Sequence, residues 1–428
     1  MPPELLILEP DARGHAFEWL QHIVEYSATD RHPARLALAV PAPLAEKLSA
    51  WMKTRNLHNA ELHPLSPRES ELCMHRRLAV SGLARWWTMR RHLAESGAPQ
   101  GLFLGMDHLS LPLALGLGFG GRKVSGILFR PSVHYQADNP GRLSLRERLR
   151  DLRKDLLYRL MFRNRAVKAV FSLDPYFPSY SIRRYVSGDK TKPLSDPAHP
   201  RDEGSAAASS PSPFPAGRTS FLLFGVLTER KGVLVLLEAL RALDENASRR
   251  TAILIAGEIA PEIRTAVKEL QDEVQRNNPE LWLEVEDRHL STEEISAFTR
   301  HCDVVLAPYQ RFVGSSGILL WAAGAGKPVL TQGYGLLGKL AHDYRLGTTC
   351  ETTSPSELAF AIEAAVSAGP ETLCDPCGIA RFLTGRTPRT FSSQLFNGMF
   401  HGPAPVPKPE RVTQGDASAM NWSRSRAP

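Results

Sequence analysis

Apolar positions in the first half of the chain fall into short runs that alternate with segments of helical spacing. Leu5–Leu8 is one such run, and apolar residues then recur three or four positions apart from residue 17 to 24. The same rule predicts strands at 36–40, 101–106, 124–129 and 167–173, with helices at 44–52, 69–95 and 143–162. Alternating strands and helices are typical of a parallel, doubly wound sheet. The pattern therefore predicts an α/β domain over residues 1–194.

The periodicity stops between residues 195 and 217, where the chain is rich in Pro, Ser and Ala. This composition favours a linker or a disordered loop. The alternation then resumes, with strands predicted at 220–224, 252–256, 281–285, 304–307, 328–331 and 348–350, and helices at 233–243 and 262–275. We therefore expect a second doubly wound domain over 218–380, a helix over 381–401 and a disordered tail over 402–428.

The overall composition is that of a globular protein, with 43% apolar and 23% charged residues. A formal net charge of +7 and a pI near 9.2 favour an anionic partner, such as a phosphorylated substrate, a membrane surface or nucleic acid. The first ten residues do not have the pattern of a secretory signal. The apolar stretch 109–119 is short and contains Pro112, which predicts a buried helix and not a membrane span.

The five cysteines predict neither a disulfide framework nor a metal site. Cys374 and Cys377 form a single C-x-x-C pair with Pro376 between them, and no second pair follows at zinc-binding spacing. We interpret them as two incidental thiols and expect a cytoplasmic protein.

The first segment that predicts chemistry is 224–232, which reads Phe-Gly-Val-Leu-Thr-Glu-Arg-Lys-Gly. The pattern predicts a strand, a tight loop and the start of a helix. Gly225 lets the backbone approach a ligand closely, and Arg230 and Lys231 place cations near a helix N-terminus. These features favour a binding site for a diphosphate. The alternative is an ordinary turn with two solvated cations.

A second segment of this kind, Gly314-Ser315-Ser316-Gly317, is predicted to open a helix. Small residues at a helix start leave backbone N–H groups accessible, and two serine hydroxyls add donors. This start suits a phosphate or sugar hydroxyls, although an ordinary capped helix would look similar. Two such starts after strands of one doubly wound domain favour a shared ligand, because ligands collect at the carboxyl ends of parallel strands.

Together with Ala-Gly-Lys-Pro-Val at 325–329, these segments resemble the donor domain of group 1, or family 4, GT-B glycosyltransferases over about residues 220–370. The resemblance implies two Rossmann-like doubly wound domains that face each other across a cleft, with 381–401 crossing back onto the first domain. It implies a nucleoside-diphosphate sugar as donor, with Lys231 neutralising the diphosphate and the Gly314 helix start contacting the donor. No metal and no cofactor are expected, because cationic side chains take the place of a metal.

The sequence departs from the family pattern at three positions. Val226 stands where the family usually has an arginine, and Val313 and Trp321 stand where it has two glutamates. Trp321 cannot accept hydrogen bonds from ribose hydroxyls as a glutamate does. Arg230 is our candidate to supply the missing arginine's charge. The departures fit either a divergent enzyme or a protein that has lost catalysis.

On the acceptor side, Asp107, His108 and His134 each follow a predicted strand, so we expect them to point toward the cleft. A histidine or carboxylate there could deprotonate an acceptor hydroxyl, which makes Asp107 and His134 the catalytic candidates. For both residues the alternative is a purely structural hydrogen bond. His15 and Glu258 are weaker candidates for the same cleft.

Residues 142–165 form a strongly basic segment with one leucine stripe at helical spacing. The stripe consists of Leu145, Leu149, Leu152, Leu156 and Leu160. Such a helix can dock on anionic lipid, which would suit a lipid-linked acceptor. We favour the alternative, in which the leucines pack on their own domain and the arginines face water. No stacking aromatics are interleaved with the charges, which argues against nucleic acid.

The sequence therefore predicts a glycosyltransferase that moves a sugar from a nucleoside-diphosphate sugar to a polysaccharide, lipid-linked or small-molecule acceptor. It is expected in the cytoplasm or peripherally at the inner membrane face. Lys231, Arg230 and the Gly314 helix start would stabilise the departing diphosphate in the transition state. An inactive GT-B module that binds a sugar nucleotide or glycan is the main alternative, favoured by Val313 and Trp321. A nucleotide-sugar epimerase is a third.

Overall fold

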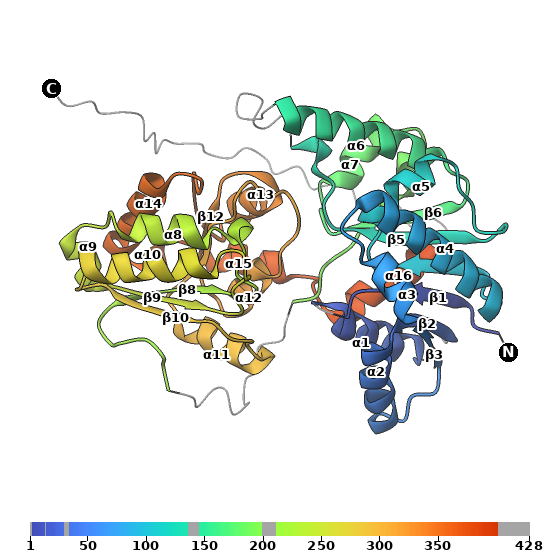
Figure 1. Ribbon diagram of the computed structural model, residues 1–428, viewed down its shortest axis with the longest axis horizontal. Coiled ribbons are helices and arrows are strands. Elements are labelled where there is room, and N and C mark those ends of the chain that lie inside the picture. Colours follow the sequence, from blue (N-terminus) through green and yellow to red (C-terminus); the bar gives the residue numbers. More distant parts are fainter. Residues whose placement is uncertain (1, 13, 30–33, 136–144, 199–210, 401–428) are drawn as a thin grey trace.

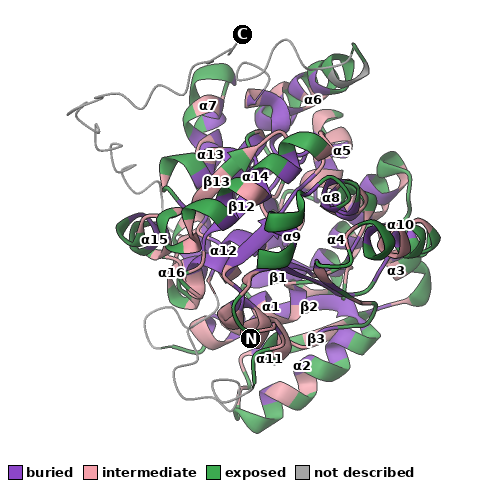
Figure 2. Ribbon diagram, turned by 90° about the vertical axis from the view of Figure 1, so that its left-hand side faces the viewer, coloured by how far each residue is buried: buried purple, intermediate pink, exposed green. Residues whose placement is uncertain are grey.

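The computed structural model describes residues 2–12, 14–29, 34–135, 145–198 and 211–400. These residues form two α/β domains that lie side by side (Figure 1). Each domain is built on one parallel sheet, and the central strands of both sheets are buried beneath helices whose outer faces are exposed (Figure 2). The predicted fold class, two doubly wound α/β domains, is therefore confirmed.

The N-terminal sheet has seven parallel strands among the described residues, in the order β3-β2-β1-β4-β5-β6-β7. They are β1 (Leu5–Leu8), β2 (Leu36–Pro41), β3 (Ala60–Leu65), β4 (Gln100–Phe103), β5 (Lys123–Leu128), β6 (Val167–Ser172) and β7 (Thr191–Pro193). The helices of this domain are α1 (Ala16–Ser27), α2 (Ala42–Thr54), α3 (Pro67–Cys73), α4 (Leu78–Ser96), α5 (Ser110–Ala114), α6 (Leu145–Arg163) and α7 (Phe177–Arg184). The strand order reverses at β1, which lies between β2 and β4, and such a switch point is where ligands bind in open α/β sheets.

The C-terminal sheet repeats this plan with six parallel strands in the part of the chain that is described, in the order β10-β9-β8-β11-β12-β13. They are β8 (Thr219–Phe224), β9 (Thr251–Ala256), β10 (Trp282–Glu286), β11 (Val304–Ala307), β12 (Val329–Gln332) and β13 (Gly347–Cys350). The helices are α8 (Val233–Leu240), α9 (Glu245–Arg250), α10 (Arg264–Asn277), α11 (Thr292–His301), α12 (Ile318–Gly324), α13 (Gly335–Asp343), α14 (Pro355–Ala368) and α15 (Pro376–Leu383). Its switch point lies between β8 and β11, so both domains present the carboxyl ends of central strands for binding.

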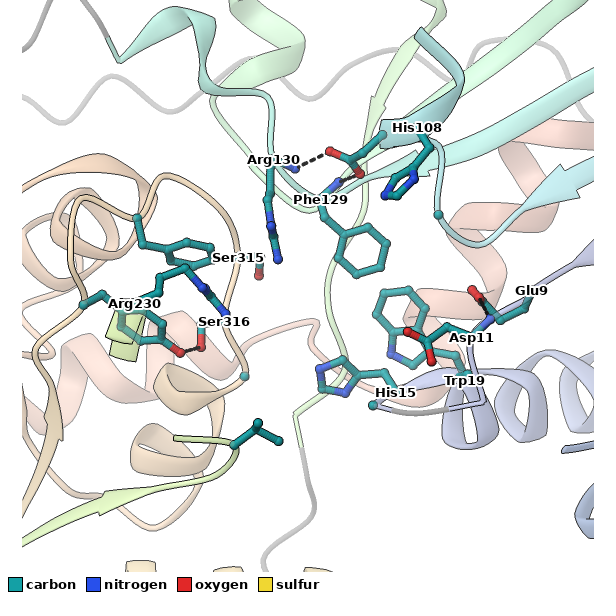
Figure 3. A pocket seen from close by; sticks show the side chains of 18 of the residues that line it. Glu9, Asp11, His15, Trp19, His108, Phe129, Arg130, Arg230, Ser315 and Ser316 are labelled. Carbon is teal, nitrogen blue, oxygen red and sulfur yellow. Dashed lines mark hydrogen bonds between the residues drawn. The ribbon is translucent and has the colours of Figure 1, made fainter. Parts of the chain in front are cut away.

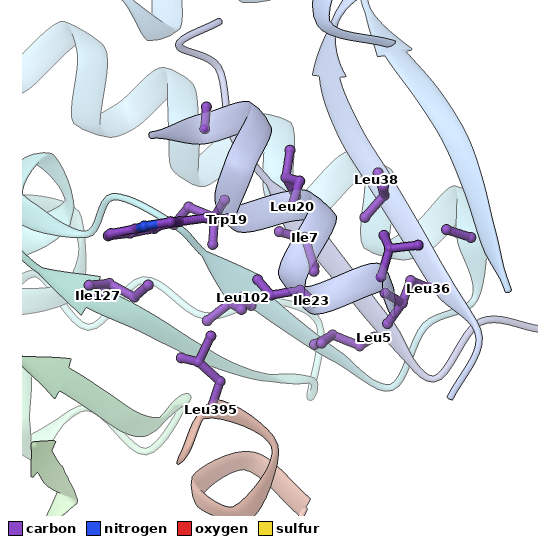
Figure 4. Packing of buried hydrophobic residues seen from close by; sticks show 14 of the residues in the cluster. Leu5, Ile7, Trp19, Leu20, Ile23, Leu36, Leu38, Leu102, Ile127 and Leu395 are labelled. Carbon is purple, nitrogen blue, oxygen red and sulfur yellow. The ribbon is translucent and has the colours of Figure 1, made fainter. Parts of the chain in front are cut away.

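The core of the N-terminal domain shows why these residues form strands. Successive side chains of β1 alternate between two apolar clusters, one on each face of the sheet. Leu5 and Ile7 face α1, where they meet Trp19, Leu20 and other buried side chains (Figure 4). A strand buried on both faces needs apolar residues at every position, which is why β1 is a continuous apolar run.

The last described helix, α16 (Pro388–Phe400), belongs to the N-terminal core although it follows the C-terminal domain in sequence. Leu395 and Phe396 are buried in the same cluster as Trp19. The Ser392 hydroxyl also donates to the backbone carbonyl of His22 in α1 at 3.0 Å. The chain thus crosses between the domains a second time within the predicted 381–401 segment, and the two domains are held by two connections.

Several details of the sequence prediction were wrong. The helix predicted at 69–95 is two helices, because α3 ends at Cys73 and α4 begins only at Leu78. The edge strands β3 and β7 were not predicted. The helix expected over 109–119 is limited to α5, and Leu115 just beyond it is 65% exposed.

The predicted linker lies partly within the described residues, and the predicted tail lies outside them. In the predicted linker, Asp196 and Phe214 are both buried, while 199–210 lie outside the described residues. The predicted tail, 402–428, lies wholly outside them. None of the helices in the described part of the chain has the length and apolar character needed to cross a bilayer.

The packing expected for the basic helix is also wrong. α6 was expected to bury its leucine stripe against its own domain, but all five leucines of the stripe are exposed. The buried face carries Asp151 and Asp155 together with Tyr158, Met161 and Phe162. Helical spacing identifies a stripe correctly, yet it cannot say which side of the helix meets the domain.

Candidate active site

A cavity of about 580 Å³ lies between the two domains (Figure 3). The N-terminal domain lines it with Glu9, Asp107 and Arg130, which follow β1, β4 and β5. The C-terminal domain lines it with Arg230 and Ser316, which follow β8 and β11. The carboxyl ends of both sheets therefore open onto one shared cavity, as expected for ligand sites in open α/β sheets.

The loop after β8 depends on glycine geometry. Gly225 and Gly232 have φ angles of +98° and +78°, which side chains with a Cβ rarely adopt. A Cβ on Gly232 would overlap the carbonyl oxygen of Pro308 in the loop after β11. Glycine at this position therefore lets the loop after β8 lie directly against the loop after β11.

Tyr309 connects the two predicted donor motifs. The Lys231 ammonium lies 4.9 Å from the centre of the Tyr309 ring, and the Tyr309 hydroxyl is 2.6 Å from the Ser316 hydroxyl. Burial raises the pKa of Tyr309, but the charge of Lys231 and the hydrogen bond with Ser316 outweigh burial, so this pKa lies below its ordinary value. The two motifs thus form one hydrogen-bonded and electrostatically coupled unit.

Two arginines from opposite domains meet at the ring of Phe312. The Arg230 guanidinium lies 4.5 Å from the ring centre, and the Arg130 guanidinium lies 5.5 Å from it. Burial lowers the pKa of Arg230, and the charge of Arg130 acts in the same direction. Two like charges beside one cavity repel each other until an anion binds between them. This pair is therefore suited to bind phosphate groups from both sides.

The domains approach each other closely at the second motif. The backbone N–H of Ser315 donates to the carbonyl oxygen of Phe129 in the N-terminal domain at 3.2 Å. A Cβ on Gly317 would lie 3.4 Å from Cε1 of His15, whose ring stacks on Trp19. Small residues at this motif thus allow the N-terminal domain to close one side of the cavity.

The three residues that depart from the family pattern have defined positions in the structure. Val226 lines the cavity and is 62% exposed. Trp321 lies on α12, where its ring contacts the edge of Phe224 at 6.5 Å between centroids. Val313 packs against the C-terminal core. The carboxylates expected at 313 and 321 are therefore replaced by apolar packing, whereas Arg230 places a positive charge in the cavity that Val226 also lines.

Residues 218–368 match the model of the family described as glycosyl transferases group 1. The C-terminal domain is a group 1 glycosyltransferase domain. No curated relative matches the chain.

Three solved structures share the fold of this chain over 92–93% of its length. Anabaena HepE in complex with UDP and glucose has a TM-score of 0.60 at 14% identity, over 92% of this chain and 98% of that one. WaaG, a glycosyltransferase involved in lipopolysaccharide biosynthesis, has a TM-score of 0.61 at 16% identity, over 93% and 100%. Sucrose-phosphate synthase from Thermosynechococcus elongatus has a TM-score of 0.64 at 14% identity, over 92% and 97%. The predicted GT-B fold is thus confirmed.

Within the group 1 domain, the predicted donor residues divide into two sets. The residues that line the cavity are Arg230, Ser315, Ser316 and Gly317. Gly225, Lys231 and Gly314 are not among the residues that line it. Lys231 donates to the carbonyl oxygen of Phe224 at 3.3 Å. The helix start is also later than predicted, because α12 begins at Ile318. Lys231 also contacts Tyr309, which does line the cavity.

Asp107 lines the GT-B cavity, but both of its carboxylate oxygens are already engaged. They accept the backbone N–H groups of Phe129 at 2.9 Å and Arg130 at 3.0 Å. These bonds fix the chain just after β5, where the Arg130 side chain begins. The position of Asp107 favours the structural alternative, in which it positions Arg130.

His134 is not among the residues that line the cavity. Its surroundings fit the alternative of a purely structural role. Its side chain is 8% exposed, and Nε2 lies 3.0 Å from Oδ2 of Asp174. The Tyr135 hydroxyl donates to the same oxygen at 2.6 Å. The imidazole is enclosed by the rings of Tyr135, Phe177 and Tyr180. The expectation that His134 points into the cleft is therefore wrong.

Glu9 is a cavity residue that the sequence analysis missed. It follows β1 at the switch point, is 8% exposed and lines the cavity. Burial raises its pKa to about 7, although the backbone N–H of Asp11 and the charge of Arg85 both lower it. A carboxyl group with this pKa can accept or donate a proton near neutral pH.

The signal for Glu9 was present in the sequence. It directly follows the apolar run Leu5–Leu8, and it is a charged residue at the carboxyl end of a predicted central strand. The same rule that selected Asp107 selects Glu9. Of the weaker candidates, His15 also lines the cavity.

Proposed function

We propose that the protein transfers a sugar from a nucleoside-diphosphate sugar to an acceptor held by the N-terminal domain. The observation that carries this proposal is the convergence of Arg130 and Arg230 beside the Ser315–Ser316 loop in one interdomain cavity. The group 1 match over 218–368 and the UDP-bound structures of HepE support a nucleotide-sugar donor.

In this proposal the diphosphate leaving group lies between the two arginines. As the glycosidic bond to the donor sugar breaks, negative charge develops on the diphosphate, and preorganised cations stabilise it without reorganisation. Arg230 and Arg130 contact the phosphates, while Lys231 holds and polarises Tyr309 next to Ser316. Because these side chains supply the positive charge, the proposal requires neither a metal nor a cofactor.

On the acceptor side, we propose Glu9 as the group that exchanges a proton with the acceptor hydroxyl. It stands on the opposite wall of the cavity from Arg230 (Figure 3). Asp107 is assigned to positioning Arg130 through its two backbone hydrogen bonds. We also propose a cytoplasmic protein that works peripherally at the inner membrane face, consistent with its net charge of +7.

A catalytically inactive binding module is the second candidate, because Val313 and Trp321 replace the family's glutamates. An inactive module would bind the sugar nucleotide without releasing nucleoside diphosphate. Turnover therefore separates the two candidates.

The test uses a panel of nucleotide sugars, thermal stabilisation to find the donor, and release of nucleoside diphosphate to detect turnover. Arg230→Ala is expected to reduce kcat/KM by roughly 100-fold, because it removes a cation from the departing charge. Arg276→Ala, an exposed arginine on α10 of the same domain, is the matched control and should change it less than about twofold. Unchanged turnover in Arg230→Ala would refute the assigned site, and stabilisation without any turnover would leave the binding module.

A further inference from the structure

The helix α6 exposes an apolar stripe on its outer face, while its inner face buries two carboxylates together with Tyr158, Met161 and Phe162. Asp151, Asp155 and Tyr158 on its inner face are 2%, 8% and 0% exposed. On its outer face, Leu145 and Leu149 are 78% and 66% exposed. A surface helix of a globular protein normally turns its apolar stripe toward the core.

The inner face of α6 is fixed by specific polar contacts. Asp155 accepts hydrogen bonds from Arg184 at 3.0 Å and from the Tyr185 hydroxyl at 2.7 Å, both at the end of α7. Asp151 accepts one from the Ser132 hydroxyl at 3.3 Å. Rotating the helix to bury its leucines would break these contacts and leave buried carboxylates unpaired, which is costly. The outward orientation of the leucines is therefore built into the domain.

The exposed leucines form one continuous stripe. The stripe consists of Leu145, Leu149, Leu152, Leu156 and Leu160, which are 78%, 66%, 65%, 53% and 38% exposed. Spacings of three and four residues keep all five on one side of the helix. Contiguous apolar surface of this kind marks an interaction site in a soluble domain.

Arginines border the leucine stripe along the helix. Arg150, Arg153 and Arg163 are exposed, and they lie on the same helix as the leucines. An exposed leucine stripe flanked by arginines is suited to an anionic lipid surface. The leucine side chains would enter the boundary of the acyl region, and the guanidinium groups would reach the lipid phosphates. A second copy of the same helix would instead bring arginine against arginine, which disfavours self-association.

The helix α6 is also connected to the cavity. Lys154 on its inner side donates to the backbone carbonyl of Arg130 and, at 3.4 Å, to the Ser132 hydroxyl. The Arg130 side chain lines the cavity. In Figure 1, α6 runs along the outer edge of the N-terminal domain beside α7. A surface bound by α6 would therefore lie next to the N-terminal wall of the cavity.

We infer that the leucine stripe of α6 inserts into the headgroup region of an anionic bilayer, and that the sugar acceptor is carried by a lipid in that bilayer. The second part rests on the proposed glycosyltransferase function. The first part does not, because it depends only on the exposed stripe and its arginines.

The experiment measures co-sedimentation of the full chain with vesicles of phosphatidylcholine mixed with phosphatidylglycerol, and with vesicles of phosphatidylcholine alone. The wild type should bind the mixed vesicles, and more weakly the neutral ones. The double variant Leu149→Ser/Leu156→Ser should bind mixed vesicles at least tenfold more weakly, because both inserted side chains are lost. Phe360→Ser, which changes a 69% exposed side chain on α14, is the matched control and should bind like the wild type.

Folding and function are measured on the same variants. Because the two leucines are exposed, the double variant should melt at or slightly above the wild-type temperature and keep the same thermal stabilisation by nucleotide sugars. Equal vesicle binding by wild type and double variant would overturn the inference. So would a dimer in sedimentation velocity that only the leucine variant abolishes, which would assign the stripe to a second copy of the chain.

The two parts of the inference can fail separately. Vesicle binding without sugar-nucleotide binding would overturn the proposed function and leave the docking surface. Turnover with a soluble acceptor, together with no vesicle binding, would leave the function and remove the docking surface and the lipid-carried acceptor.

Discussion

The two walls of the interdomain cavity are built in different ways. The C-terminal wall comes from two loops, one after β8 and one after β11, and Gly232 lets the first lie against the second at Pro308. The N-terminal wall comes from single residues that follow separate strands, such as Glu9 and Arg130. The first wall depends on backbone geometry, whereas the second depends on individual side chains held by burial and hydrogen bonds.

This difference teaches what each wall can do. A wall made of backbone and small side chains suits the invariant part of a donor, a diphosphate that needs donors and positive charge. A wall made of individual side chains can change residue by residue, which suits an acceptor that differs among glycosyltransferases. Arg130 is the exception, since it reaches from the N-terminal wall to the phenyl ring shared with Arg230.

The largest expected effect comes from a substitution in the C-terminal wall of the cavity, which depends on backbone geometry. Gly232→Ala places a Cβ in the carbonyl oxygen of Pro308 at a φ of +78°, so it adds a steric clash to backbone strain. We expect it to lower the free energy of unfolding by roughly 3–4 kcal/mol. Chemical denaturation of the purified variant measures this loss.

Gly217→Ala is the control that separates backbone strain from the steric clash expected at residue 232. Gly217 has a φ of +80°, and a Cβ there would meet no atom within 4 Å. Only the strain of about 1–2 kcal/mol is expected at this site. Equal losses at Gly217 and Gly232 would mean that contact between the two donor loops does not constrain residue 232.

The next prediction concerns the N-terminal wall of the cavity and the pH dependence of stability that Glu9 contributes. The pKa of Glu9 is about 7 in the folded protein against 4.5 in a solvated chain, so the folded state binds more protons between these values. The contribution of Glu9 to stability therefore falls as pH rises from 4.5 to about 7. Glu9→Gln removes this dependence and should be more stable than the wild type above pH 7, by up to about 3 kcal/mol.

Glu262→Gln, at an exposed position before α10, is the control for Glu9 and should follow the wild type at every pH. Under the proposed acceptor-side role, Glu9→Gln also loses turnover even though it gains stability. A Gln variant with wild-type turnover would leave Glu9 as a buried cavity residue without a part in proton transfer.

Much of the fold could be predicted from the sequence, because the central strands of both sheets are buried on both faces and are continuous apolar runs. The same signal was too weak at the two edges of the N-terminal sheet. β3 contains Glu61, His63 and Pro64 beside its apolar positions, and β7 has only three residues. Periodicity also could not place α6, since its leucine stripe is regular whichever face meets the domain.

The candidate site was predictable where it is contiguous in sequence and not where tertiary packing decides. Arg230 and Ser315–Gly317 line the cavity because each is carried there by a short loop after a central strand, β8 or β11. His134 and Asp107 both follow strands, yet one is enclosed by three aromatic rings and the other is engaged by two backbone N–H groups. Burial and local partners of this kind depend on residues distant in sequence, such as Asp174 and Phe177.

The central claim is that both domains bind one diphosphate, and calorimetric titration of Arg130→Ala tests it most directly. The ligands are the best-bound nucleoside diphosphate from a panel including UDP, and the corresponding nucleoside as a control without phosphates. We predict that Arg130→Ala and Arg230→Ala each weaken diphosphate binding by roughly tenfold or more and leave nucleoside binding unchanged. Undiminished diphosphate binding by Arg130→Ala would contradict the account, because the N-terminal wall would then make no contact with the donor phosphates.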